Sequence, residues 1–262
     1  MTAAPPAPDN AAVVARLRSA GCVFAEDEAH LLLAGAGSPA RLEALVRRRV
    51  AGEPLEHLLG WAEFCGLRIA VAPGVFVPRR RSELLVHEAA ALAPSRAVVV
   101  DLCCGSGAVA AALSTRLDRP EVHASDVDPA AVACARRNLP GGSVHAGDLF
   151  DALPTALRGR VDVLVANVPY VPSDAIALMP PEARQHEPRT ALDGGADGLD
   201  LHRRVAAGAP GWLAPGGALV LETSAAQADR TAAVVRAAGL ATAVHVDAEL
   251  DATAVVGHRH AA

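Results

Sequence analysis

The stretch that decides the fold is Ala97-Val-Val-Val-Asp-Leu-Cys-Cys-Gly-Ser-Gly107, which runs into the alanine-rich residues 108–117. A short β-branched run, closely spaced glycines and a helical segment predict a strand that turns directly into a helix. Glycine at such a turn lets a ligand approach the backbone, and the first turn of the helix offers free N–H groups. The stretch therefore predicts a ligand-binding loop at the carboxyl end of a strand.

Similar strand-like runs alternate with alanine-rich helical segments through the rest of the chain. We expect strands at residues 97–100, 122–125, 143–146, 161–165, 218–221, 241–246 and 252–256, and a helix at 225–238. This alternation predicts an α/β fold with a parallel, doubly wound sheet that binds its ligand at the carboxyl ends of the strands. Residues 169–198 are rich in proline and glycine, and their length favours a functional lid or substrate loop.

The chain upstream of this region has a different pattern. Apolar residues between positions 10 and 59 recur at helical spacing, which predicts three or four short helices. Residues 61–77 alternate and contain a Pro73-Gly74 turn, which predicts a short β-hairpin. We expect an N-terminal helical substrate-binding domain at 1–60, a β-hairpin linker at 61–80 and an α/β domain at 81–262.

Composition excludes several classes of function. All 24 basic side chains are arginine, so Schiff-base chemistry on lysine and the lysine of a P-loop are excluded. The net charge of −5 gives no general attraction to nucleic acid or anionic lipid. The ten histidines and five cysteines show no ligand spacing, and we expect no metal site.

The same composition favours a cytoplasmic protein. The cysteines form no C-x-x-C pair and their number is odd, which fits a reduced compartment better than a disulfide scaffold. Residues 1–10 lack the basic start of a signal peptide, and charges interrupt every apolar stretch before the ~20 residues that a membrane span needs. We therefore expect no membrane association.

Acidic residues follow the second and third strands. Asp126 ends the second strand about 20 residues after the glycine loop, where a carboxylate can accept both hydroxyls of a ribose. Asp148 follows the third strand, and the apolar Leu149 and Phe150 beside it are placed to flank a purine. Capping of the next turn is the alternative role for Asp148. The pattern predicts a pocket for a nucleoside.

The glycine loop leaves two kinds of cofactor open. Gly105-Ser-Gly-Ala-Val-Ala110 also satisfies the dinucleotide pattern G-x-G-x-x-A, which a nicotinamide or flavin enzyme would share. Asp101 favours a different ligand, because its charge would repel a pyrophosphate and attract a sulfonium or an ammonium. S-adenosylmethionine carries both of these cations, and we expect it as the cofactor.

The fourth strand ends in Asn167-Val-Pro-Tyr170 at the same edge of the sheet. The Asn167 oxygen and the Val168 carbonyl can accept the two N–H groups of a planar NH2, while Pro169 stiffens the turn and Tyr170 can stack on the plane. These are the requirements of N-methylation, because the acceptors direct the nitrogen toward the methyl donor. An Asn-Pro turn with a packed tyrosine is the structural alternative.

Taken together, these motifs resemble the HemK/PrmC-type protein N5-glutamine methyltransferases, the release-factor glutamine methyltransferase family. The resemblance covers most of residues 50–225. It is carried by residues 101–107, Asp126, Gly147-Asp148, residues 167–170, His186-Glu-Pro-Arg189, Ala191-Leu-Asp-Gly-Gly195 and Asp197-Gly-Leu-Asp200, with Gly52-Glu-Pro-Leu55 and Phe64-Cys-Gly-Leu67 upstream.

The resemblance implies a class I S-adenosylmethionine-dependent methyltransferase with a Rossmann-like, mostly parallel seven-stranded sheet. The acceptor that it implies is the glutamine of a Gly-Gly-Gln loop in a peptide chain release factor or related protein. Asn167, Val168, Pro169 and Tyr170 are expected to be catalytic. The residues expected to bind the cofactor are Asp101, Cys103, Gly105, Gly107, Asp126, Asp148, Leu149 and Asn167.

The sequence departs from the family pattern at three places. Cys103 replaces the first glycine of the loop, and we expect it to fit with a negative φ. Val168 replaces the first proline of Asn-Pro-Pro-Tyr and keeps the carbonyl. Pro78-Arg-Arg-Arg-Ser-Glu83 replaces Pro-Arg-Pro-Glu-Thr-Glu on the side expected to hold the substrate. These changes favour a paralogous branch.

Two other functions share some of these features. Exocyclic-amine methylation of nucleic acid uses the same tetrapeptide, but Phe24 alone offers stacking in the helical region. A non-catalytic paralogue that binds S-adenosylmethionine is the third reading. The arginine runs 47–49 and 79–81 are interpreted mainly as solvated surface. Glu222 is either a solvated carboxylate at a strand end or a residue near the pocket, and the sequence favours neither interpretation.

Overall fold

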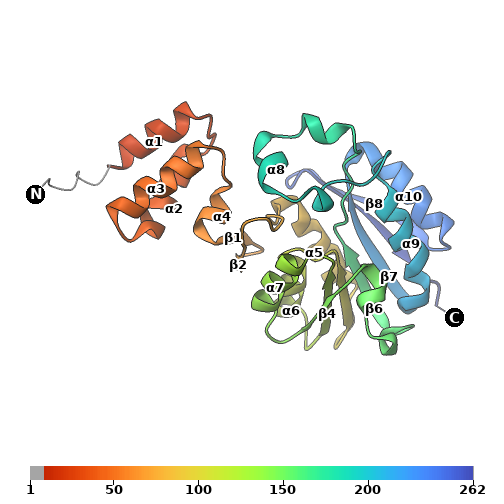
Figure 1. The fold of residues 1–262 in the computed structure, drawn as a ribbon. Helices are drawn as coiled ribbons and strands as arrows, with labels where there is room; N and C mark the ends of the chain where they lie inside the picture. Colours follow the sequence, from red (N-terminus) through yellow and green to blue (C-terminus); the bar gives the residue numbers. More distant parts are fainter. Residues whose placement is uncertain (1–8, 262) are drawn as a thin grey trace, which may run out of the picture.

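The computed structural model describes residues 9–261, so the expectation for the first eight residues lies outside the described part. Four helices come first: α1 (Asn10–Ser19), α2 (Ala25–Ala36), α3 (Pro39–Val50) and α4 (Leu55–Leu59). Their shared core contains Leu17, Leu32 and Val46, which are fully buried. The helical spacing thus correctly predicted a small helical unit, which lies to one side of the sheet (Figure 1).

Local signals explain where α3 starts and α2 ends. The hydroxyl of Ser38 accepts a hydrogen bond from the Arg41 N–H at the start of α3, and Pro39 occupies the first helical position. Gly37, at the end of α2, has φ +67, a left-handed conformation that glycine adopts without strain.

A two-stranded hairpin follows, with β1 (Trp61–Phe64) antiparallel to β2 (Leu67–Ala70). Its turn is Cys65-Gly66, both with positive φ, whereas Pro73-Gly74 lies beyond β2. The prediction of a hairpin is confirmed, but the Pro-Gly pair bends the connection after it. The Asn138 side chain accepts from the Ala70 N–H and donates to its carbonyl, which fixes the hairpin to helix α7 (Pro129–Asn138).

The remaining chain forms one seven-stranded sheet. Its strands are β3 (Val98–Leu102), β4 (Glu121–Asp126), β5 (Ser143–Ala146), β6 (Val161–Ala166), β7 (Leu213–Thr223), β8 (Ala241–Asp247) and β9 (Ala252–His258). They lie in the order β5-β4-β3-β6-β7-β9-β8, and β9 runs antiparallel to both of its neighbours. All seven expected strands are present, and the mostly parallel α/β sheet is confirmed.

Helices cover both faces of this sheet (Figure 1). One face packs against α5 (Glu83–Leu92), α6 (Ala108–Arg116) and α7 (Pro129–Asn138), and the other against α9 (Asp200–Trp212) and α10 (Ala228–Ala237). The predicted helix at 225–238 is divided into a 3-10 turn, η6 (Ala225–Gln227), and α10. Within residues 9–261, no helix combines the length and the apolar character that a membrane crossing requires.

Short elements connect these strands and helices. The 3-10 turn η1 (Arg80–Ser82) precedes α5, η2 (Leu149–Ala152) follows β5, and η3 (Thr155–Leu157) precedes β6. The proline- and glycine-rich segment after β6 contains η4 (Ala175–Leu178), α8 (Pro181–His186) and η5 (Arg189–Ala191).

Candidate active site

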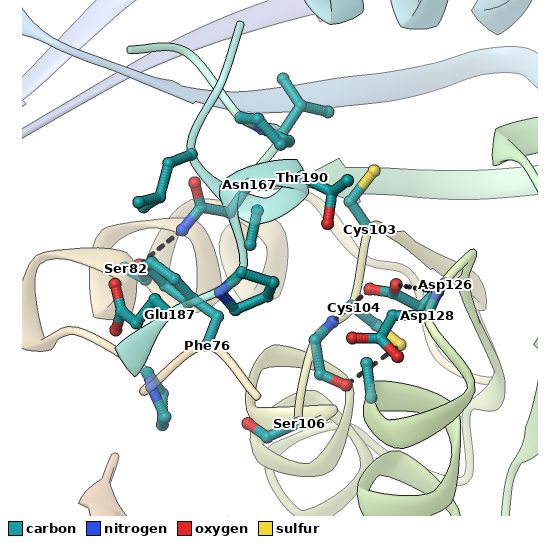
Figure 2. Close-up of a pocket in the computed structure, with 18 of the residues that line it drawn as sticks. Phe76, Ser82, Cys103, Cys104, Ser106, Asp126, Asp128, Asn167, Glu187 and Thr190 are labelled. Atoms are coloured by element: carbon teal, nitrogen blue, oxygen red, sulfur yellow. Dashed lines mark hydrogen bonds between the residues drawn. The ribbon is translucent and has the colours of Figure 1, made fainter. Parts of the chain in front are cut away.

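A cavity of about 650 Å³ opens at the carboxyl ends of β3, β4, β5 and β6. Parallel strands of a doubly wound sheet are expected to place their ligand there. Nearly all of the predicted site residues line it, namely Asp101, Cys103, Gly105, Asp126, Asp148, Leu149, Asn167, Val168, Pro169 and Tyr170. Figure 2 shows the loop after β3 on one side of this space and Asn167 on the other.

Gly107 is the predicted cofactor residue that does not line the cavity. It has φ +77, and a Cβ at this position would lie 2.9 Å from the Ala135 Cβ of α7. The glycine is therefore required for close packing of the loop against α7, since a side chain would separate the two.

Cys103 occupies the position of a family glycine with φ +54. The expectation of a negative φ is wrong, because the loop keeps the left-handed conformation that glycine would adopt. A left-handed residue with a Cβ costs roughly 1–2 kcal/mol. The Cys103 side chain lines the cavity, and burial raises the pKa of its thiol.

Asp101 is a deeply buried acid of the cavity, with 2% of its surface exposed. Its Oδ2 accepts a hydrogen bond of 3.1 Å from the Ala110 N–H in the first turn of α6. Burial raises the pKa of Asp101 to about 7, and the nearby Asp126 carboxylate adds to this rise. A cation in the cavity would favour the ionised form of this carboxyl.

Asp126 ends β4 and holds the glycine loop in place. Its two oxygens accept from the Gly105 N–H at 2.8 Å and the Asp128 N–H at 2.9 Å. Burial raises the pKa of this carboxyl, and the backbone hydrogen bonds oppose that rise. Each oxygen keeps a second lone pair, so the carboxylate can still accept from a ligand.

Asp148 does not cap the turn that follows it, and so the capping alternative is wrong. Its Oδ2 instead pairs with Arg204 of α9 at 2.7 Å, and both side chains are about half exposed. Leu149 lines the cavity, but Phe150 stacks on Trp212 with ring centroids 5.6 Å apart. The expectation that Phe150 flanks a purine is therefore wrong, because its ring packs against Trp212 of α9 and does not line the cavity.

Asn167 follows β6 directly and projects toward the cavity (Figure 2). Its Nδ2 donates a hydrogen bond of 3.1 Å to Ser82 Oγ, which comes from η1. No hydrogen bond within residues 9–261 engages Asn167 Oδ1 or the Val168 carbonyl. Two acceptors are thus available at the end of this strand.

The segment around Gly194 fixes the backbone of the tetrapeptide. The Val171 N–H donates to the Leu192 carbonyl, and the Gly194 N–H donates back to the Val171 carbonyl at 2.8 Å. A Cβ at position 194 would lie 2.7 Å from Tyr170 Cα and 2.8 Å from the Pro169 carbonyl oxygen. Only glycine allows this approach without displacing the tetrapeptide.

Tyr170 and Arg81 meet at a buried carboxylate. The Tyr170 hydroxyl donates to Glu222 Oε1 at 3.1 Å, and the Arg81 Nε donates to the same oxygen at 3.2 Å. Glu222 is 2% exposed, so its interpretation as a solvated strand end is wrong. Burial and the Glu222 charge raise the pKa of Tyr170.

The arginine runs are also less solvated than expected. Arg79 pairs with Glu187 at 2.5 Å, and the side chain of Glu187 is 1% exposed. Arg49 is only 10% exposed and donates to both oxygens of Glu28. The solvated interpretation is therefore wrong for Arg49, while Arg79 and Arg81 are partly exposed but each pairs with a buried acid.

Sequence reasoning missed Ser82, Glu187 and Arg204, which all line the cavity. Glu187 lies in a stretch that carries the family resemblance and Ser82 in one that departs from it, so both stretches drew attention without indicating a contact. Arg204 is one of two adjacent arginines on α9, and no pattern in the sequence distinguishes it.

The strand order, the single antiparallel strand and the cavity define a class I S-adenosylmethionine-dependent methyltransferase. A family model described as Methyltransferase small domain matches residues 66–180. The structure of a methyltransferase from Pyrococcus furiosus has the same fold, with a TM-score of 0.57 and 16% identity over 74% of this chain and 90% of that chain.

Relatives with similar sequences identify the family to which the chain belongs within this class of methyltransferases. A release factor glutamine methyltransferase from Cereibacter sphaeroides is 39% identical over 256 residues, 88% of this chain and 89% of the relative. The 4-amino-L-phenylalanine/4-methylamino-L-phenylalanine methyltransferase of Streptomyces pristinaespiralis is 37% identical over 232 residues, 85% of this chain and 78% of the relative. The chain belongs to the release factor glutamine methyltransferase family, as its motifs indicated.

The residues of the cavity fit S-adenosylmethionine, the cofactor of this enzyme class. The buried Asp101 carboxyl suits a ligand with positive charge, since an anion there would face an acid that is nearly fully buried. Asp126 at the end of β4 keeps acceptor capacity for hydroxyl groups. A dinucleotide pyrophosphate would instead approach the carboxylates of Asp101 and Asp126, which would repel it.

Proposed function

We propose that this protein transfers a methyl group from S-adenosylmethionine to N5 of a glutamine side chain in a protein, namely the glutamine of a Gly-Gly-Gln loop in a peptide chain release factor. The observation that carries the proposal is the pair of unengaged acceptors, Asn167 Oδ1 and the Val168 carbonyl, at the cavity. Relatives named release factor glutamine methyltransferase support the choice of acceptor.

Asp101, Asp126 and Asp148 would hold the cofactor, which supplies an electrophilic methyl group. On the acceptor side, Asn167 Oδ1 and the Val168 carbonyl each accept one N–H of the planar amide. Fixing both N–H groups orients the nitrogen lone pair, and orientation supplies much of the rate enhancement of a displacement reaction. Tyr170 lines the same end of the cavity and contributes a wall against which the amide plane can rest.

No strong general base is needed before transfer. An amide nitrogen is a weak nucleophile, and it becomes acidic once it carries the additional methyl group. Its proton can then leave through the same acceptor contacts. Glu222 is held by Tyr170 and Arg81 and does not line the cavity, so we assign it to support of Tyr170.

The acceptor is proposed to enter between the N-terminal helices of residues 1–60 and the segment that contains α8. Arg49 of α3 reaches Glu182 of α8 at 3.4 Å, and Glu182 lines the cavity. The helical unit is thus connected to the wall of the acceptor side. This placement supports the proposed division into a helical substrate-binding domain at 1–60, a linker at 61–80 and a catalytic domain at 81–262.

The proposal is tested with purified protein, methyl-labelled S-adenosylmethionine and a recombinant bacterial release factor. We expect label on N5 of the Gly-Gly-Gln glutamine, and none on a release factor in which that glutamine is replaced by alanine. Asn167→Ala should lower turnover at least about tenfold while cofactor affinity changes little, because the lost contact is to the acceptor. Cofactor binding without any label on the release factor would overturn the acceptor but leave the cofactor assignment intact.

A second acceptor is favoured by Arg81. Its Nε pairs with Glu222, but 46% of its side chain is exposed and it lines the acceptor side of the cavity. A guanidinium there can bind a carboxylate, which a free amino acid carries and a glutamine within a protein chain does not. The relative named as acting on 4-amino-L-phenylalanine supports an aromatic amine acceptor, whose nitrogen is also nearly planar.

One parallel assay distinguishes the two candidate acceptors. 4-Amino-L-phenylalanine replaces the release factor, and the product is identified by mass spectrometry. If the amino acid is the acceptor, its analogue 4-(2-aminoethyl)aniline, which lacks the carboxylate, should show a KM about tenfold or more higher with the wild-type protein, because a charge-assisted contact is lost. Methylation of the release factor alone would reject this second candidate.

A further inference from the structure

We propose that Ser82 is a positioning residue that holds the Asn167 amide in place, with Nδ2 on the Ser82 hydroxyl and Oδ1 free for the methyl acceptor. The Asn167 Nδ2 donates to Ser82 Oγ at 3.1 Å, the dashed contact in Figure 2. The inference deepens the proposed function, because it concerns the same acceptor site. It requires only that a nitrogen with N–H groups be methylated there, whether it belongs to a glutamine or to an aromatic amine.

The orientation of the amide decides what Asn167 can do. One end of the group is an oxygen that only accepts, and the other is an NH2 that only donates. With Nδ2 occupied by Ser82, Oδ1 is left to accept an N–H of the methyl acceptor. A rotation by half a turn would place the NH2 opposite the acceptor N–H groups and remove the contact that orients the reacting nitrogen.

Ser82 is well placed to hold this orientation because it cannot move easily. It is 3% exposed and ends η1, immediately before α5. The residues around it are attached to two separate parts of the fold. Arg79 pairs with Glu187, which lies between α8 and η5, and Arg81 pairs with Glu222 of β7.

Both carboxylates in these pairs are nearly fully buried, with 1% and 3% of their side chains exposed. Breaking such a pair leaves a buried charge without a partner, which is strongly unfavourable. The turn that carries Ser82 is therefore fixed on two sides. The arginine turn, residues 79–82, therefore has a structural role. It holds the Ser82 hydroxyl against the Asn167 amide, which lies 85 residues further along the sequence.

The first test does not depend on any acceptor. The chain has three asparagines, Asn10, Asn138 and Asn167, so protein labelled with ¹⁵N-asparagine gives three side-chain NH2 signals. Asn167→Asp identifies the signal of Asn167 by its loss. Asn138 is an internal control, because its Nδ2 donates to the Ala70 and Ser106 carbonyls, both at 2.8 Å.

We expect Ser82→Val to shift the Asn167 signals and to accelerate their exchange with solvent at least severalfold, while those of Asn138 stay unchanged. Ser82→Thr, which has nearly the same shape as valine but keeps the hydroxyl, should leave the Asn167 signals close to those of the wild type. Ser82→Ala repeats the test if valine prevents folding. Unchanged Asn167 signals in the valine or alanine variant would overturn the proposal.

The second test measures coupling in turnover with whichever acceptor the protein methylates. Ser82→Ala should lower kcat about tenfold, the loss expected when a positioning hydrogen bond is removed, with an unchanged cofactor Kd. Ser82→Thr should restore most of the rate. A merely structural role would instead alter the cofactor Kd and Tm in parallel.

A double-mutant comparison tests whether Ser82 acts on turnover through the Asn167 amide. In an Asn167→Ala background, Ser82→Ala should cause no further loss, because there is no amide left to orient. In an Asn167→Asp background the effect should also shrink, since both ends of a carboxylate are acceptors. If the losses in kcat multiply in either background, the proposal is overturned. A shifted NMR signal without turnover on any acceptor would count against the proposed function alone.

Discussion

Asp101 offers the sharpest test of how this site balances stability against cofactor binding. The perturbation is Asp101→Asn, which removes the charge and keeps an oxygen that can accept from the Ala110 N–H. The carboxyl is 2% exposed, and burial raises its pKa from 3.8 to about 7. We expect the variant to be more stable than the wild type in the absence of cofactor.

The magnitude and its pH dependence follow from the two pKa values. Between about pH 4 and pH 7 the folded protein keeps a proton on Asp101 that the unfolded chain has already lost. The free energy of unfolding therefore falls as pH rises through this window, and the full penalty is present above pH 7. The difference between 3.8 and about 7, at about 1.4 kcal/mol per pH unit, sets an upper limit of roughly 4 kcal/mol.

Urea unfolding of both proteins at pH 5 and pH 8 measures this effect. From the same two pKa values, the stability advantage of Asp101→Asn should be about 1.5 kcal/mol at pH 5 and should approach roughly 4 kcal/mol at pH 8. Calorimetry should show weaker S-adenosylmethionine binding by the variant, and proton release when the wild type binds below pH 7. Asp118→Asn is the control, because Ser95 and Arg119 lower the pKa of that exposed acid and no gain is expected. An advantage equal at both pH values would refute the burial argument.

Three further predictions concern the loops of the cavity. Gly194→Ala should destabilise the fold by about 1–3 kcal/mol and lower turnover at least tenfold, because its Cβ would meet the tetrapeptide backbone. Unfolding and methylation assays measure the two effects. Gly141→Ala is the control and should change neither quantity, because there is open space around Gly141. Cys103→Gly should be about 1 kcal/mol more stable to urea than Cys103→Ala, since only glycine relieves the left-handed backbone. Asp126→Ala should weaken S-adenosylmethionine binding in calorimetry by about 1.5–3 kcal/mol, and an unchanged affinity would reject its role.

The parts of the fold that sequence reasoning predicted are those governed by local pattern. The β-branched runs and the alanine-rich segments between them predicted all seven strands, and the signal is clearest for β3 and β6, because burial on both faces requires continuous apolar residues. The glycine loop and the tetrapeptide meet at one cavity because parallel strands end at the same edge. The hairpin turn was assigned less well, since Cys65-Gly66 carries a weaker turn signal than Pro73-Gly74.

The parts that were missed depend on contacts between distant residues. Nothing local to Ser82 shows that the Asn167 amide lies beside it, and the φ of Cys103 is set by the loop around it. Glu222 illustrates the same limit. A carboxylate at a strand end is normally solvated, and it is buried here because Arg81 and Tyr170 converge on it from other elements.

These buried pairs also determine how acceptor choice can be studied. Replacing all three arginines of residues 79–81 would remove surface charge, but it would also leave Glu187 and Glu222 buried without cationic partners. The resulting instability would be read wrongly as a loss of acceptor binding. Arg80 forms no ion pair within residues 9–261, so Arg80→Gln changes the charge at the turn while the Arg79 and Arg81 pairs stay intact. A substitution at Arg80 therefore separates electrostatic attraction of an acceptor from the positioning that Arg79 and Arg81 provide for Ser82.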